Sequence, residues 1–133
     1  MKYETKDSGA REEFKTGSRR DTQVGKPRYD LVPPLALKRI AELYARGAEK
    51  YGEYNWEIGQ PYSRMIASMM RHLYQFMEGE TTEDHLAALV WGALGIMHFE
   101  EVGRSYELDD LPLHKHKREE ITYHAEVDTG NRL

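Results

Sequence analysis

Apolar residues recur at helical spacing in three separate stretches of the chain. The first stretch begins at Pro34, a residue that suits the first turn of a helix, and stops before Gly52. Its apolar positions, three and four residues apart, share one face: Leu35, Ala36, Ile40, Leu43, Tyr44, Gly47 and Tyr51. The pattern predicts a helix that ends at Gly52, with alternating charges on its solvent face.

Two further helices are predicted after a loop over residues 53–60. The second runs from Pro61 to Glu78, and it places His72 inside an apolar stripe. The third follows Thr81-Thr82, where Thr81 and Asp84 have the spacing of a capping pair, and it continues to about Glu101. Small residues on one side of this third helix predict close approach by a neighbouring helix: Ala88, Gly92 and Gly95.

Three helices over residues 34–103 leave no room for a parallel sheet, so we predict an all-α fold, a helical bundle with extended terminal arms. We expect a single domain with an N-terminal arm over 1–25, a helical core over 26–103 and a C-terminal tail over 104–133, which holds a β-prone stretch at 121–123. Three helices make a thin core. Association into a homodimer or homotetramer is the economical way to cover the remaining apolar faces.

Composition excludes several classes of function. The chain has 133 residues and no cysteine, which rules out disulfides, thiolate nucleophiles and cysteine-based metal sites. Its first residues are polar and no apolar run is long enough for a membrane helix, so we expect a cytoplasmic protein with no membrane partner. The net charge of −4 argues against binding to nucleic acid.

The acidity is concentrated in one part of the sequence. Residues 78–110 hold nine acidic residues and one basic residue, whereas residues 1–77 are mildly basic. Such a local excess of negative charge is tolerated when the side chains are solvated or when a cation neutralises them.

The predicted hairpin between the second and third helices is the candidate metal site. Glu80 and Asp84 are one helical turn apart, and Glu83 lies between them. Carboxylates of this kind hold Mg²⁺ or Mn²⁺ together with substrate phosphates. Glu49, near the end of the first helix, is a reserve ligand. The alternative is that these acids only stabilise a helix N-terminus.

Histidines and basic residues surround this hairpin. His72 and His85 are expected at corresponding ends of adjacent helices, as general bases or orienting groups, or else as ordinary core residues. Basic residues at turns and helix ends suit phosphate contacts, although surface bases are common: Lys26, Arg28, Lys50, Arg64 and Arg71.

The loop after the first helix offers groups that recognise a nucleobase. Tyr51 and Trp56 supply planar surfaces and Asn55 an amide, unless the Trp simply anchors the loop. The sequence has none of the glycine-rich phosphate loops. Metal-bridged polyphosphate on a helical site is the interpretation that remains.

A series of short motifs runs through residues 9–101: Phe14-x-Thr16-Gly17, Arg20-Asp21-Thr22, Gly25 to Leu31, Gly47 to Gly52, Asn55-Trp56, Arg71-His72-Leu73, Gly79-Glu80 and Glu83 to Ala88. Their order resembles the phage and bacterial dATP/dGTP diphosphohydrolase family, which is commonly related to the MazG-like all-α nucleotide pyrophosphohydrolases.

The resemblance implies a Mg²⁺- or Mn²⁺-dependent enzyme that cleaves a purine deoxynucleoside triphosphate to monophosphate and pyrophosphate in phage nucleotide metabolism. It implies catalytic roles for His72, His85 and Lys50. The implied substrate contacts are Lys26, Arg28, Asp30, Tyr51, Asn55, Trp56 and Arg71, and the expected metal ligands are Glu80, Glu83, Asp84 and Glu49. Two features depart from the pattern of the relatives: the second helix lacks an E-x-x-E pair, and Gly92 follows Trp91 where family members often have Asn.

Three other functions are compatible with these residues. A nucleotide-binding protein without turnover would use the same bases and Trp, but would leave the acidic hairpin without a task. A phosphohydrolase of the HD type needs His followed by Asp, whereas this chain has Asp84-His85. A purely structural helical oligomer is the remaining alternative.

Overall fold

The computed structural model describes residues 2–115 and divides the chain into two compact units, residues 1–32 and 33–133. The second unit is helical, as predicted. Within the described residues the only sheet is a two-stranded hairpin in the first unit. The part of the predicted C-terminal tail beyond residue 115, with the β-prone stretch at 121–123, lies outside the described residues.

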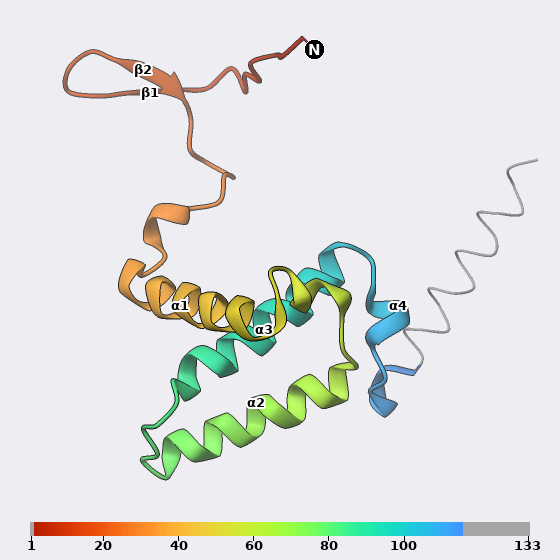
Figure 1. Cartoon of the computed structure of the whole chain (residues 1–133). Helices are drawn as coiled ribbons and strands as arrows, with labels where there is room; N and C mark the ends of the chain where they lie inside the picture. The colour runs from red at the N-terminus through yellow and green to blue at the C-terminus, as the bar shows by residue number, and fades with distance from the viewer. Residues whose placement is uncertain (1, 116–133) are drawn as a thin grey trace, which may run out of the picture. The chain divides into compact units, whose positions relative to one another are not determined.

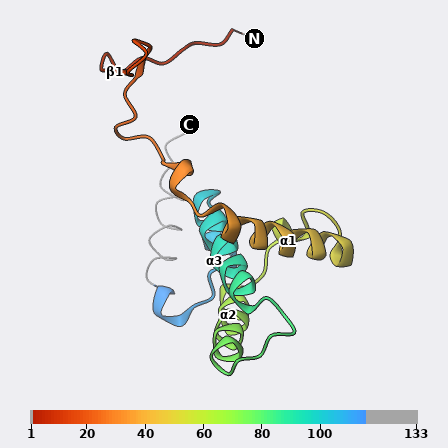
Figure 2. The same ribbon diagram turned by 90° about the vertical axis from the view of Figure 1, so that its left-hand side faces the viewer.

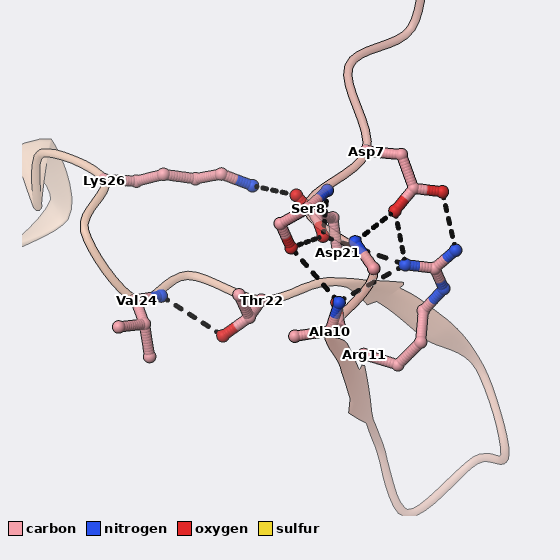
Figure 3. A network of polar contacts seen from close by, with 9 residues as sticks. Asp7, Ser8, Ala10, Arg11, Asp21, Thr22, Val24 and Lys26 are labelled. Atoms are coloured by element: carbon pink, nitrogen blue, oxygen red, sulfur yellow. Dashed lines mark hydrogen bonds and ion pairs between the residues drawn. The ribbon is translucent and has the colours of Figure 1, made fainter.

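The N-terminal unit is an antiparallel hairpin of β1 (Arg11–Glu13) and β2 (Arg19–Asp21), followed by the short 3-10 helix η1 (Tyr29–Leu31). Facing residues of the two strands carry opposite charges: Arg11 opposite Asp21, Glu12 opposite Arg20 and Glu13 opposite Arg19. Figure 3 shows how Asp21 joins the hairpin to its flanks, since it accepts from Ser8 and pairs with Lys26. Charge pairing, which a search for apolar periodicity does not detect, therefore organises this unit.

Three long helices form the second unit: α1 (Pro34–Tyr51), α2 (Tyr62–Met77) and α3 (His85–Glu101). Their bounds agree with the predicted helices to within a few residues. Pro34 occupies the first turn of α1, and Gly52 ends it at a φ of 94°. The prediction that Thr81 and Asp84 form a capping pair is wrong for Thr81, because the N-cap of α3 is Asp84. The Asp84 side chain accepts from the backbone N–H of Ala87, and α3 starts at His85.

The close α2–α3 contact confirms the prediction from the small residues of α3. A Cβ built on Gly92 would overlap the side chain of Met69, and one on Gly95 would lie 2.7 Å from Cε of Met65. The buried core lies at this contact and consists of Tyr62, Met65, Phe99 and Leu108. In both views α3 packs beside α2, while α1 crosses α3 (Figures 1 and 2).

Residues 104–115 close one end of this unit, although no core role was predicted for them. They contain α4 (Ser105–Leu108) and the 3-10 helix η3 (Pro112–His114). Arg104 donates to the backbone carbonyls of Glu57 and Ile58, the latter at 2.8 Å, so it ties α4 to the 3-10 helix η2 (Asn55–Ile58). Gly59 makes this contact possible, because a Cβ there would lie 2.9 Å from both Arg104 and Leu108.

Among the described residues no helix is long and apolar enough to cross a membrane.

The α2–α3 pair also carries exposed apolar side chains. The exposed positions include Met70, Leu73 and Met77 on α2, with Val90 and Met97 on α3. Val90 and Met97 are each two residues from Gly92 or Gly95, which meet α2, so they lie on the opposite side of α3. We call these five side chains the exposed apolar residues.

Candidate active site

A pair of buried histidines lies where α2 and α3 meet. His72, late in α2, is 8% exposed, and His85, the first residue of α3, is 2% exposed. Their Nδ1 atoms are 2.8 Å apart. The structure therefore brings together the two histidines that the sequence placed at corresponding helix ends.

Glu80 anchors this pair from the turn between the helices. Its carboxylate accepts from the backbone N–H of Thr82 at 2.6 Å, from the Thr82 hydroxyl and from Nε2 of His85. The two Thr82 hydrogen bonds, followed by the one from His85, lower the pKa of Glu80 to about 2. Glu80 is thus a carboxylate of fixed orientation, and Thr82 is a residue that the sequence did not single out.

The partners of the two rings determine where their protons lie. Because the Glu80 carboxylate only accepts, Nε2 of His85 carries a proton. In the tautomer protonated only at Nε2, Nδ1 of His85 is an acceptor. His72 then donates through Nδ1, and its own Nε2 faces the Arg71 guanidinium at 3.4 Å. Burial, followed by the charge of Arg71, lowers the pKa of His72 and favours its neutral form. His72 Nε2 therefore offers a lone pair on the Arg71 side.

Glu83 completes a group of side chains with donor atoms suited to a metal ion. One donor atom from each of His72, Glu83 and His85 lies within 4.8 Å of the other two. Glu83 is exposed, whereas both histidines are buried. Two imidazoles and a carboxylate are common ligands of divalent transition metals, so these residues fit the metal that the sequence led us to expect.

Asp84, a predicted metal ligand, has two other partners in the structure. Nε and Nη2 of Arg39 donate to its two carboxylate oxygens at 2.8 and 2.6 Å, and the Ala87 N–H donates to Oδ1 at 3.1 Å. Arg39 is the main cause of the lowered pKa of Asp84, about 2. This pair was not predictable from the sequence, because Arg39 is 45 residues away from Asp84. The helical face of Arg39 has the pattern of an ordinary charged, solvent-exposed surface.

A pocket of about 330 Å³ opens beside the C-terminal end of α1. The predicted base-recognition residues Tyr51, Asn55 and Trp56 all line it, together with Tyr44, Tyr54 and Trp91, which the sequence had not assigned to a site. Tyr54 holds a left-handed conformation with a φ of 59° just before η2, an uncommon backbone state for a non-glycine residue.

Trp56 and Tyr44 line both this pocket and a second, apolar hollow of about 480 Å³. The Trp56 ring meets the edge of Tyr44 at 6.0 Å and of His98 at 4.9 Å between centroids. Trp56 therefore packs against α1 and α3 and also lines the pocket, and its role in recognising a base stays a prediction.

Helix α3 connects the histidine pair to the pocket. Asp84, Trp91 and His98 are spaced by seven residues and so share the face that meets α1, while His85 faces α2. Trp91 follows His85 by six residues, which corresponds to roughly 9 Å along a helix axis. The pocket and the histidine pair thus lie around one short segment of α3.

The remaining predicted residues lie elsewhere on the two units. Lys50, in the last turn of α1, has its Nζ 5.2 Å from the centre of the Tyr51 ring, and Glu49 is exposed beside it. In the N-terminal unit Lys26 pairs with Asp21 at 3.1 Å, and the guanidinium of Arg28 pairs with Asp30 at 2.8 and 2.9 Å.

Comparison with known proteins identifies the family of the chain. A family model described as dATP/dGTP diphosphohydrolase, N-terminal, matches residues 16–110 and therefore covers most of the chain. No match was found among curated proteins or solved structures.

Proposed function

The chain belongs to the dATP/dGTP diphosphohydrolase family, and from that premise we propose that it hydrolyses dGTP, dATP or both to the monophosphate and pyrophosphate. The observation that carries the proposal is the placement of a buried, carboxylate-anchored histidine pair about six residues along α3 from an aromatic pocket. A triphosphate needs both a place for its base and polar groups at its phosphates.

The pocket supports recognition of the base. Its volume of about 330 Å³ is at the lower end of the usual range for small-molecule sites. Tyr51, Trp56 and Trp91 offer ring surfaces for a flat purine, and Asn55 offers an amide to a base edge. Adenine and guanine are similar in size and shape, so we propose a purine substrate without a preference between the two bases.

The phosphate groups are proposed to lie toward the histidine pair. A divalent cation, Mg²⁺ or Mn²⁺, supplies charge neutralisation at phosphate oxygens and lowers the pKa of the attacking water when it is bound. His72 and His85 orient that water or a ligand, since Glu80 determines which ring nitrogens donate. Arg71, next to His72, and Lys50 stabilise negative charge on the phosphates.

Other predicted contacts stay part of the proposal. Lys26, Arg28 and Asp30, in the N-terminal unit, stay predicted substrate contacts. Of the four carboxylates expected to bind metal, Glu83 and Glu49 stay predicted ligands. Glu80 would have to leave Thr82 and His85, and Asp84 would have to leave Arg39, to serve as a ligand.

We also propose that the protein acts as a homodimer or homotetramer in the cytoplasm, where a phage would use it to deplete one purine nucleotide. The exposed apolar residues of α2 and α3 support association, because further copies of the chain would cover them.

The test is product analysis on purified protein. We expect pyrophosphate and the monophosphate from a purine deoxynucleoside triphosphate in the presence of Mg²⁺ or Mn²⁺, and little from pyrimidine substrates. Arg71→Gln should lower kcat by at least tenfold, because it removes a charge at the histidine pair. Lys38→Gln, which removes a positive charge from an exposed position of α1 with no proposed site role, is the control. Orthophosphate or triphosphate as the main product would overturn the proposal.

The same assay addresses the alternative of a nucleotide-sequestering protein. The aromatic pocket favours this second function as far as binding is concerned, since binding alone does not require the histidine pair. Thermal stabilisation by dGTP or dATP without product under any metal would support sequestration.

A further inference from the structure

We propose that His72, Glu83 and His85 together bind one divalent transition-metal ion, and that Glu80 positions the His85 ring for this role. The three ligands come from α2, from the turn after it and from the start of α3, and their donor atoms lie within 4.8 Å of one another. The proposal deepens the proposed function and rests on it only for the use of the ion, because binding can be measured without a nucleotide.

The spacing of the two imidazoles fits a shared ion. Their Nδ1 atoms are 2.8 Å apart. Two nitrogen ligands that lie about 2.1 Å from one ion and at a right angle to each other are roughly 3 Å apart. Both Nδ1 atoms can reach the same cation when the ion replaces the hydrogen bond between them and the His72 proton moves from Nδ1 to Nε2.

Glu80 has the position of an orienting group rather than of a ligand. It accepts from Nε2 of His85 and leaves the lone pair on Nδ1, across the ring, which in the structure accepts from His72. Histidines that bind metals commonly donate their other N–H to a carboxylate, which sets the ring orientation and raises its basicity. Thr82 holds that carboxylate in turn, so the arrangement does not depend on His85 alone.

The donor set selects among the expected cations. Imidazole nitrogens suit transition metals, whereas Mg²⁺ prefers oxygen ligands and keeps much of its water. Two histidines and one carboxylate therefore favour Mn²⁺ over Mg²⁺. This set differs from the purely acidic one that the sequence suggested, in which Asp84 was a member; in the structure Arg39 occupies both of its oxygens.

Matched variants of the turn test the site by calorimetry of Mn²⁺ binding to the nucleotide-free protein. Glu83→Gln should weaken binding by at least tenfold, and Glu80→Gln by about 10–100-fold, the usual effect of losing an orienting partner. Glu78→Gln removes an identical charge from the same turn outside the cluster and should leave the affinity within twofold. Equal weakening in Glu78→Gln and Glu83→Gln would overturn the site, since it would show only a general charge effect.

A second measurement needs no variant and so does not depend on the folding of altered proteins. Pulsed electron paramagnetic resonance on the Mn²⁺-loaded protein, labelled with ¹⁵N only in histidine, should show coupling to histidine nitrogen. Bound Mn²⁺ without this coupling, or no binding of Mn²⁺, would overturn the assignment.

The two proposals fail in different ways. Nitrogen coupling in a protein that releases no pyrophosphate would support the metal site while contradicting the proposed hydrolysis. Pyrophosphate release from a protein whose Mn²⁺ lacks nitrogen coupling would support hydrolysis and overturn the histidine ligands.

Discussion

Asp84 shows how one side chain links two levels of the structure. Its carboxylate caps α3 through the Ala87 N–H and holds α1 through both donors of Arg39. The first contact is local, so a residue of its type is expected at such a position. The second depends on how α1 crosses α3, which no local pattern reveals.

Two substitutions at this position separate the contacts. Asp84→Ala should lower the free energy of unfolding by about 0.5–2 kcal/mol through loss of the cap alone. Asp84→Asn keeps a capping oxygen and should cost less, because the exposed Arg39 makes the ion pair worth little. Urea denaturation measures both. A loss from Asn as large as that from Ala would show that the ion pair, not the cap, is the main contribution.

The lowered pKa values predict how acid affects stability. Asp84 and Glu80 have pKa values of about 2, below their ordinary values of 3.8 and 4.5. Both carboxylates favour the folded state above their unfolded pKa values, and this contribution is lost as the pH falls toward 2. The difference in Tm between the native chain and Asp84→Asn should therefore be present at pH 6 and disappear near pH 2. A difference that grows on acidification would contradict this assignment.

At the scale of elements, α3 determines how the helices meet. It presents one face to α2 and another to α1, and small residues occupy the α2 face. Its apolar periodicity made the helix predictable, and its glycines made close packing predictable. The choice of partner for each face was not predictable, because several helices offer apolar faces of similar quality.

The two glycines of α3 should respond differently to alanine. Gly92→Ala would overlap Cγ and Sδ of Met69, near the middle of that side chain, and should destabilise the protein by about 1–3 kcal/mol through overpacking. Gly95→Ala meets only the terminal Cε of Met65 at 2.7 Å, which can turn aside. Its packing cost should be largely offset by a gain in helix propensity of about 1 kcal/mol. Thermal unfolding of both variants checks the order, and a more damaging Gly95→Ala would contradict it.

At the scale of the whole molecule, the exposed apolar residues of α2 and α3 predict that the chain associates with further copies of itself. Met97 is 59% exposed and Met70 53%, and α1 contains no buried residue. Exposed apolar side chains on adjoining helices are unusual for a monomeric protein and commonly mark an interface.

Light scattering after size-exclusion chromatography tests this interface. The native chain should have the mass of a dimer or tetramer, and Met97→Glu should shift it toward the monomer because a charge would be buried at the contact. Leu35→Glu introduces the same charge at the exposed start of α1, outside the exposed apolar residues of α2 and α3. It should leave the mass of the assembly unchanged. A native chain of monomeric mass would contradict the prediction.

The sequence by itself determined the three helices, their approximate ends, the family and the residues from which a site had to be drawn. Each of these depends on periodicity, on turn residues or on motif order, all of which are local properties. Only the tertiary structure decided that His72 lies against His85, that Glu80 orients this pair and that Arg39 holds Asp84. Hydrogen-bond geometry between elements depends on helix crossing and register, and a shift of one residue would place these same side chains on different faces.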